Sequence, residues 1–292
     1  MINKLKILFR ALTGEFIKIR AKILWKVELQ CVRKRRTCPI DVSLTSYGWR
    51  VEKIVPYTIL SILKQSVRPE KICLWLDKNK WNDSNLPLKI KNLRKFGLEV
   101  NYCDDIGPYT KLIPFLHKYP EKTVVTVDDD IYYSKSMIKE LYLLHRKHPN
   151  SIITENFCYP EFMGGSLQPY KKWKEYHVVK EDQVFNSLLI FPQGFGGVLY
   201  PSRILGNEVK DETLFKRLSP YADDVWFYMV GLKRGVKKVY VKHSKTEYFL
   251  IDLFRQIRTR DRLHDINVGE DKNDLQIKAI CRNFNINLES YE

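Results

Sequence analysis

The chain has 292 residues, 44% of them hydrophobic, which is enough for a substantial packed core in one large domain or two small ones. This composition excludes an intrinsically disordered protein, and the lack of any run of about 18 apolar residues predicts that the chain does not span a membrane. The 50 Lys and Arg residues against 34 Asp and Glu give a net charge of +16, which favours anionic partners: phosphorylated substrates, acidic lipid headgroups or nucleic acid.

The first predicted element is a basic amphipathic helix within residues 2–36. Apolar residues recur at mostly helical spacing from Ile2 to Val27, with Lys and Arg between them. This pattern is typical of a helix on an anionic membrane surface. The alternative is a helix packed on the domain with a solvated basic face. We expect this helical segment to occupy residues 1–38.

Strand-like and helix-like segments alternate from Pro39 onward, which predicts an α/β fold with a mostly parallel central sheet flanked by helices. The expected strands are 40–45, 71–76, 98–102, 123–127 and one that starts at 152, and the expected helices are 54–64, 88–96, 111–117 and 137–148. We expect the catalytic domain to span 39–250. Residues 251–292 are expected to form a charged, partly helical extension.

Six cysteines show no CxxC pair and no metal-finger spacing. This favours reduced thiols and a cytoplasmic protein. Together with the basic helix, it predicts a peripheral protein on the inner face of the cell membrane.

Three consecutive carboxylates, Asp128, Asp129 and Asp130, follow the β-branched segment 123–127. Ligands of open α/β sheets bind at the carboxyl ends of strands, and adjacent carboxylates repel one another unless a cation or proton intervenes. Mg²⁺ or Mn²⁺ bridging to the phosphates of a substrate is therefore the first hypothesis. The alternative is an acidic start to the next helix, with Ser134 or Ser136 as its N-cap.

Four motifs occur in an order that resembles the GT-A glycosyltransferases, in particular the bacterial family-2-like enzymes of capsule and lipopolysaccharide gene clusters. They are LTSYGWR at 44–50, GPYTK at 107–111, the Asp128–Asp130 triplet, and GGVLYP at 196–201 followed by ADDVW at 222–226. The resemblance implies a GT-A (nucleotide-diphospho-sugar transferase) fold. It also implies metal-dependent transfer of a sugar, from a nucleotide-sugar donor expected to be UDP-linked to a glycan or lipid-linked acceptor in bacterial surface polysaccharide synthesis.

The same resemblance assigns roles to individual residues. The nucleotide sugar is expected to contact Thr45, Ser46, Tyr47, Arg50, Asp77, Lys111, Asp128 and Asp129. The metal, Mn²⁺ or Mg²⁺, is expected on Asp130 with help from Asp128, and His243 is favoured over His264 as a further ligand. Its role would be to stabilise the diphosphate leaving group as the sugar–phosphate bond breaks.

The pair Asp223–Asp224 matches the position of the catalytic base in inverting members of the family, with Asp224 as the favoured base. The alternative is an acidic N-cap pair on the helix from Val225. Gly196 and Gly197 are expected to let the backbone approach a sugar or acceptor, and Trp226 to stack on an apolar sugar face.

Other functions fit part of the pattern. A metal-dependent phosphoesterase or nuclease would use the carboxylates, but no nucleic-acid module is recognisable and we expect no nucleic-acid partner. A haloacid-dehalogenase-type phosphatase requires a small Thr or Val where this chain has Tyr132. A glycoside hydrolase also uses two carboxylates but needs no diphosphate-binding metal. Non-catalytic binding of anionic lipid or nucleic acid is the alternative of a different class. The donor sugar, acceptor and stereochemistry stay open at this stage.

Overall fold

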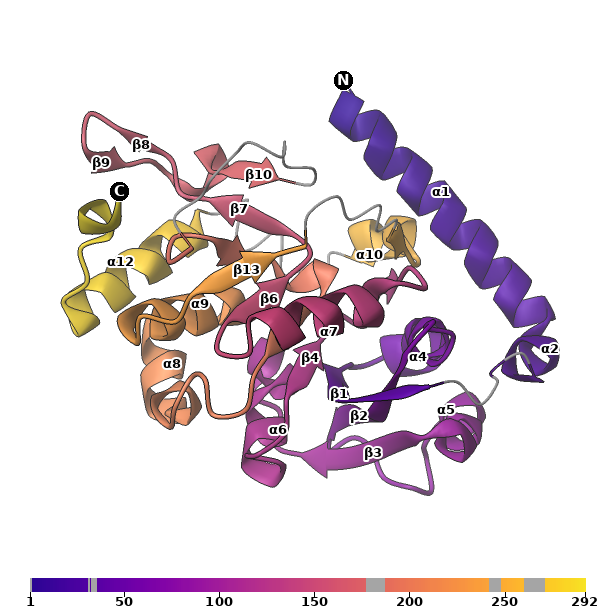
Figure 1. Cartoon of the computed structure of the whole chain (residues 1–292). Coiled ribbons are helices and arrows are strands. Elements are labelled where there is room, and N and C mark those ends of the chain that lie inside the picture. Colours follow the sequence, from indigo (N-terminus) through magenta and orange to yellow (C-terminus); the bar gives the residue numbers. More distant parts are fainter. Residues whose placement is uncertain (1, 31, 33–35, 177–186, 242–247, 260–270) are drawn as a thin grey trace.

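The computed structural model describes residues 2–30, 32, 36–176, 187–241, 248–259 and 271–292. The strands of its central sheet are β1 (Thr37–Thr45), β2 (Arg68–Asp77), β3 (Leu98–Cys103), β4 (Val124–Thr126), β6 (Ile152–Thr154), β12 (Val198–Tyr200) and β13 (Lys238–Tyr240). The seven strands have the order β13-β6-β12-β4-β1-β2-β3 (Figure 1). All neighbouring pairs are parallel except those of β12, which runs antiparallel to both β4 and β6.

Three small sheets accompany it: β5 (Ile131–Tyr132) with β14 (Phe249–Leu250); β7 (Phe157–Tyr159) between β10 (Lys174–Tyr176) and β11 (Phe191–Pro192); and β8 (Phe162–Met163) with β9 (Ser166–Leu167). The α-helices are α1 (Ile2–Ile23), α2 (Trp25–Gln30), α3 (Arg50–Lys53), α4 (Val55–Leu63), α5 (Leu88–Leu93), α6 (Ile113–Lys118), α7 (Met137–Lys147), α8 (Glu212–Leu218), α9 (Asp223–Lys233), α10 (Leu253–Thr259) and α12 (Lys272–Phe284). The 3₁₀-helices are η1 (Arg94–Phe96), η2 (Gly107–Lys111), η3 (Tyr170–Lys172), η4 (Gly194–Gly196), η5 (Glu208–Lys210) and η6 (Leu288–Tyr291).

Helices cover both faces of the central sheet, and β2 shows why its sequence suits this place. Successive side chains of a strand point to opposite faces. Ile72, Leu74 and Leu76 pack in the core that includes α4 and α7, whereas Cys73 and Trp75 pack in the core that includes α9 and α12. Burial on both faces is typical of parallel strands between helical layers. The sheet and its flanking helices confirm the expected α/β fold with a mostly parallel central sheet.

The two terminal segments share these cores with the central residues. Ala21, Leu29 and Ile251 belong to the core on the α4 face, and Ile277 and Ile280 to the core on the α9 face. Described residues of the segments expected at 1–38 and 251–292 therefore pack in the same cores as residues of the domain expected at 39–250.

Two of the helices expected from the sequence begin differently in the structure. The expected helix at 54–64 is preceded by the short helix α3, which begins at Arg50, and the segment expected as a helix from 111 begins as the 3₁₀-helix η2. Among the described residues, the cysteines at 38, 73, 103, 158 and 281 form no disulfide; Cys31 lies outside the described residues. None of the described helices combines the length and apolarity needed to cross a bilayer.

Candidate functional site

The candidate site lies where the carboxyl ends of β1 and β4 meet. The two strands are parallel neighbours, and Ser43 of β1 is paired with Thr126 of β4. The segments that follow them therefore leave the sheet at the same edge, where ligands of open α/β sheets bind. Two buried cations, Arg50 and Lys111, meet the carboxylates there.

Asp129 is the most buried carboxylate of the triplet, with 6% exposure. Its Oδ2 accepts a hydrogen bond from the Ser46 hydroxyl at 2.5 Å, and its Oδ1 accepts one from Arg50 Nη1 at 2.5 Å. Its main-chain oxygen accepts a third hydrogen bond, from the Thr58 hydroxyl on α4, at 2.6 Å. Burial raises the pKa of Asp129 to about 6, although Arg50 opposes the shift. Because both carboxylate oxygens are used inside the fold, Asp129 anchors the loop of the triplet.

Arg50 also connects Asp130 to the C-terminal part of the chain. Its Nη2 lies 3.2 Å from Asp130 Oδ2 and donates to the side-chain oxygen of Gln256 on α10. The main-chain oxygen of Asp130 accepts a hydrogen bond from the N–H of Ile251 at 2.8 Å. Burial lowers the pKa of Arg50, but Asp129 and Asp130 outweigh it and raise the pKa above its usual value. The guanidinium therefore stays charged at the centre of this group.

Lys111 is the second buried cation, with 7% exposure. Its Nζ lies 2.9 Å from Asp223 Oδ2, 3.3 Å from Asp128 Oδ1 and 3.5 Å from Asp224 Oδ1. The contact with Asp223 Oδ2 is an ion pair without hydrogen-bond geometry. Burial lowers the pKa of Lys111, but the charges of Asp223, Asp224 and Asp128 raise it well above its usual value. The ammonium therefore joins η2, the triplet and the start of α9.

Sheet contacts hold Lys111 in this place. The Ser43 hydroxyl of β1 donates to the main-chain oxygen of Lys111 at 2.6 Å, and Trp75 Nε1 of β2 donates to the Ser43 hydroxyl at 2.9 Å. This chain of hydrogen bonds ties η2 to two central strands.

Asp224 is the more accessible member of the acidic pair at the start of α9. Its side chain is 30% exposed, against 9% for that of Asp223. The Gly194 N–H donates to Asp224 Oδ2 at 3.0 Å and so orients the carboxylate. A Cβ at Gly194 would lie 2.8 Å from Asp224 Oδ1 and 2.9 Å from Lys111 Nζ. Only glycine leaves room for both charged groups as they stand.

The site carries an excess of negative charge in a strongly basic protein. Five carboxylates, at positions 128, 129, 130, 223 and 224, stand against the two cations Arg50 and Lys111, so three negative charges remain when all five are ionised. Burial, followed by the charge of Asp224, raises the pKa of Asp223 to about 7, while Lys111 opposes that shift. The cluster therefore favours a bound cation or a retained proton.

Asp128 and Asp130 are the members of the triplet that fit a hard divalent cation. Their side chains are 34% and 24% exposed, whereas Asp129 is enclosed by Ser46 and Arg50. Mg²⁺ commonly uses one or two carboxylates and completes its coordination with water and substrate phosphates. Within the described ranges, no three His, Cys, Asp or Glu side chains form a metal site by themselves. The predicted ligand His243 lies outside those ranges.

The remaining residues predicted to bind the nucleotide have diverse surroundings. The Thr45 hydroxyl donates to the main-chain oxygen of Trp75 at 3.0 Å, within the sheet. Tyr47 is 43% exposed, with the Arg50 guanidinium 5.1 Å from its ring centroid. Asp77 ends β2 and accepts a hydrogen bond from the Asn79 N–H at 2.9 Å. Of these three, Tyr47 is the side chain most open to a ligand.

The predicted role of Trp226 is wrong. Its side chain has 0% exposure and packs against Phe215 and Phe284, and its Nε1 donates to the main-chain oxygen of Val209 at 2.9 Å. A ring enclosed in this way cannot stack on a sugar.

Gly196 and Gly197 are needed for packing within the fold, whereas the sequence predicted that they let the backbone approach a sugar or acceptor. Both are buried. A Cβ at Gly196 would lie 2.2 Å from Asn156 Nδ2, and one at Gly197, whose φ is +91°, would lie 3.3 Å from Met137 Sδ. The close approach that they allow is to neighbouring side chains of the fold.

The helix-capping alternative is confirmed in part for the triplet, because Ser136 is the N-cap of α7, and is wrong for Asp223 and Asp224, which lie in the first turn of α9. The N-cap of α9 is Ala222, and no side chain caps that helix. The N-cap of α7 is Ser136, again without a side-chain cap hydrogen bond, and the triplet instead binds Arg50 and Lys111.

Sequence reasoning missed two residues of the site, Gln256 and Gly194. Gln256 is 2% exposed and lies 206 positions after Arg50, and no local pattern marks it. Gly194 stands in the glycine-rich segment 193–197, so a signal was present, but the segment was expected to approach a sugar rather than a carboxylate.

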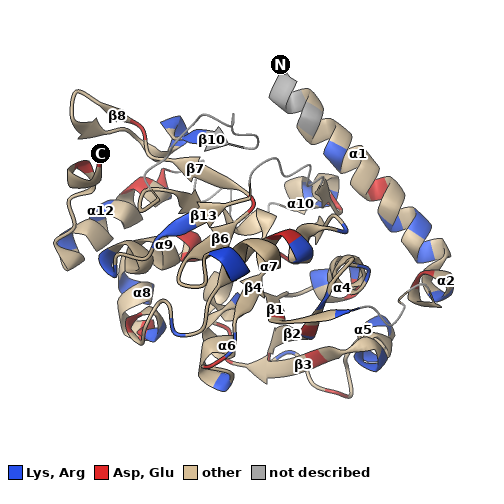
Figure 2. Cartoon of the chain, in the orientation of Figure 1, with Lys and Arg blue, Asp and Glu red and all other residues tan. Residues whose placement is uncertain are grey.

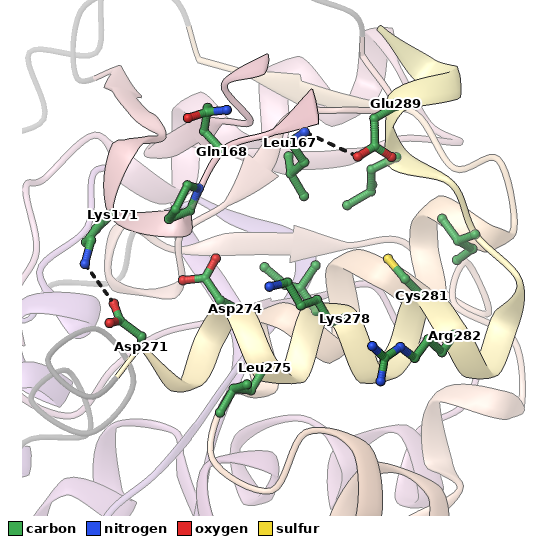
Figure 3. A pocket seen from close by; sticks show the side chains of 14 residues that line it. Leu167, Gln168, Lys171, Asp271, Asp274, Leu275, Lys278, Cys281, Arg282 and Glu289 are labelled. Carbon is green, nitrogen blue, oxygen red and sulfur yellow. Dashed lines mark hydrogen bonds and ion pairs between the residues drawn. The ribbon is translucent and has the colours of Figure 1, made fainter. Parts of the chain in front are cut away.

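A groove of about 570 Å³ lies elsewhere, between the η3 region and α12 (Figure 3). Lys171, Lys278 and Arg282 line it together with Asp271 and Asp274, and Lys171 pairs with Asp271 at 3.3 Å. None of the residues predicted for the site lines this groove.

No protein-family model matches the chain, and no curated protein matches it. Among solved structures, the 1–349 portion of TarS from S. aureus in complex with UDP-GlcNAc is similar, with a TM-score of 0.47 and 16% identity over 73% of this chain and 58% of that one. The same portion in complex with UDP gives a TM-score of 0.49 and 17% identity, over 85% of this chain and 72% of that one. A 4-diphosphocytidyl-2C-methyl-D-erythritol synthase gives 0.44 and 7%, over 79% and 99%. The chain thus spans under two thirds of the first of these structures, and its function has to be argued from its own residues.

Proposed function

We propose that the protein is a metal-dependent glycosyltransferase that moves a sugar from a nucleotide-sugar donor, UDP-linked, to a glycan or lipid-linked acceptor in bacterial surface polysaccharide synthesis. The observation that carries the proposal is the acidic cluster at the carboxyl ends of β1 and β4, with two accessible carboxylates of the triplet on one side and Asp224 on the other. A diphosphate brings negative charge to an already acidic site, so a divalent cation is needed between the two.

In this proposal Asp128 and Asp130 hold Mn²⁺ or Mg²⁺. When bound, the cation supplies Lewis-acid stabilisation of the diphosphate leaving group. Asp129 anchors the loop through Ser46 and Arg50, so that its two neighbours keep their positions. Tyr47, a residue that is 43% exposed, is the proposed contact for the nucleotide base.

Asp224 is the proposed general base. Its carboxylate is 30% exposed, and the Gly194 N–H fixes one oxygen, so the group is both reachable and oriented. As the acceptor hydroxyl attacks the sugar, its proton passes to Asp224. Lys111 lies within 3.5 Å of Asp224 and limits the build-up of negative charge around it. A base in this position supports inversion at the anomeric carbon.

The experiment that tests the proposal is a thermal-shift titration with UDP and UDP-GlcNAc, with Mn²⁺ or with a chelator. These two ligands come first because TarS has been solved with both. A ligand at about 100 times its dissociation constant adds roughly 2.7 kcal/mol to stability, which is a readily measured shift. We expect the shift to need the metal and to be lost in Asp130→Ala.

Turnover is then read as release of UDP, and the anomeric configuration of the product by NMR. Chelator-insensitive binding that survives in Asp130→Ala would reject the metal site. Hydrolysis of a simple phosphodiester, without binding of any nucleotide sugar, would favour the phosphoesterase alternative, which uses the same carboxylates.

A further inference from the structure

Helix α1 packs on the domain with a narrow face of small residues. Ala11 and Ala21 are 1% and 3% exposed. A Cβ at Gly14 would lie 1.9 Å from the main-chain oxygen of Leu250, so the helix touches the backbone of β14 directly. Lys18 forms an ion pair with Asp252 beside this contact. The helix is therefore fixed to the domain along one side.

The opposite side of α1 is a continuous apolar stripe exposed to solvent. Its members recur at intervals of three or four residues, which places them on one helical face. They are Leu5 (59% exposed), Phe9 (64%), Leu12 (55%), Phe16 (67%), Ile19 (55%) and Ile23 (75%), continued by Val27 (51%) of α2. Figure 1 shows α1 along the edge of the molecule, with this length of helix away from the sheet. Large exposed apolar patches of this kind mark surfaces that bind a partner.

Basic side chains border the stripe. Residues 2–27 contain seven Lys and Arg but one Glu. At helical spacing Arg20 falls on one side of the stripe and Lys22 on the other, and both are exposed. Figure 2 shows Lys and Arg positions distributed along α1. An apolar face with basic flanks fits lipid acyl chains below and anionic headgroups at the same depth as the ammonium and guanidinium groups.

We propose that the exposed stripe of α1 binds the surface of an anionic lipid bilayer, with the helix lying in the plane of the interface. Charge selects this occupant over a second copy of the chain. Two copies joined through their stripes would bring like-charged flanks together, whereas anionic lipid complements them.

The helix also lies next to the candidate site. The strand that it touches, β14, is followed by Ile251, whose N–H binds the main-chain oxygen of Asp130. This contact connects the helix that would bind the bilayer to the main chain of the triplet.

The test is co-sedimentation of the full chain with vesicles of phosphatidylglycerol and phosphatidylcholine in equal parts, and with vesicles of phosphatidylcholine alone. No donor or acceptor is added, so a failure here leaves the proposed reaction untouched. We expect binding to the anionic vesicles that is roughly ten- to a hundred-fold tighter than to the neutral ones and that weakens as salt is raised.

Phe16→Asp and Ile23→Asp change exposed side chains and should leave thermal melting unchanged, but each should weaken vesicle binding by about ten-fold or more. Leu275→Asp on α12 is the matched control, because Leu275 is 65% exposed, and its vesicle binding should equal that of the unaltered chain. Equal binding by Phe16→Asp and the unaltered chain would overturn the proposal. So would a dimer in analytical ultracentrifugation that Phe16→Asp converts to a monomer while vesicle binding persists, since the stripe would then bind a second copy.

Discussion

The two buried cations of the site, Arg50 and Lys111, contact carboxylates that differ in their exposure to solvent. Arg50 pairs with Asp129, which is 6% exposed and fully engaged, and its other contacts reach Asp130 and Gln256. Lys111 lies closest to the buried Asp223 but also faces Asp128 and Asp224, whose side chains are 34% and 30% exposed. A buried carboxylate that loses its cation strongly destabilises the fold, because it is left unpaired without access to water. A partly exposed carboxylate can instead exchange its cation for a bound ligand. The contacts of Arg50 therefore hold the site together. The more exposed carboxylates around Lys111, Asp128 and Asp224, are the ones that a substrate can reach.

The largest expected effect is on turnover and falls on the Lys111 side. A general base contributes about 10² to 10⁴ in rate, so Asp224→Asn should lower kcat by that order while metal-dependent donor binding stays nearly unchanged. Asp223→Asn should be milder, because Asp223 is buried against Lys111. Initial rates and donor affinities of the two variants check this. The reverse ranking would assign the base to Asp223, and near-normal rates in both would remove the pair from the reaction.

A second prediction compares how removal of each cation changes the free energy of unfolding. Arg50→Met leaves Asp129 as a buried carboxylate without its cation and should cost about 3–5 kcal/mol in the free energy of unfolding. Lys111→Met should also destabilise, but excess Mn²⁺ should restore much of the loss, because the carboxylates that it exposes can bind the metal. Denaturant unfolding with and without Mn²⁺ measures both. Equal rescue of the two variants, or of neither, would remove the distinction between the two sides.

Gly194→Ala should have a smaller effect on both stability and rate. The added Cβ would lie 2.8 Å from the Asp224 carboxylate and 2.9 Å from the Lys111 ammonium, so these groups would have to shift, a crowding that typically costs about 1–3 kcal/mol. We expect a measurable drop in melting temperature together with a loss of turnover. Gly235→Ala is a useful comparison, because its φ is +66° but no atom lies within 4 Å of its added Cβ. It should therefore alter stability through backbone strain while leaving turnover intact.

Over a single pH unit, the smallest expected effect is a pH dependence of stability that comes from Asp223. Its pKa is raised to about 7 in the folded protein, from 3.8. The native state therefore holds a proton that the unfolded chain has released, and this group's contribution to stability is lost as pH rises from about 4 to about 7, by at most about 1.4 kcal/mol per pH unit. Asp223→Asn removes the titration, so its melting temperature should depend less on pH in that window than that of the unaltered chain. Parallel profiles of melting temperature against pH for the two proteins would show that folding does not raise the pKa of Asp223.

Much of the architecture follows from local patterns. Strand β2 alternates residues that serve two cores, and the boundary at Gly97, with φ +101°, closes η1 where a residue without a Cβ is favoured. The apolar sequence of α4 predicts a buried helix, and all nine of its residues are buried. Such features depend on neighbours within a few positions, so one sequence is enough to predict them.

The sequence by itself determined that carboxylates gather at the end of a buried strand and that residues 2–27 carry apolar and basic residues at helical spacing. Only the tertiary structure decided that Asp129 turns inward to Arg50, that Gln256 joins it, that Trp226 is enclosed, and that α1 packs with its small residues and leaves its large apolar ones in solvent. The physical reason is the distance along the chain between the residues that interact. Periodicity and propensity act between residues a few positions apart. The pairing of a carboxylate with its cation, and the choice of which helical face is buried, depend on groups up to 238 positions apart that only the folded chain brings into contact.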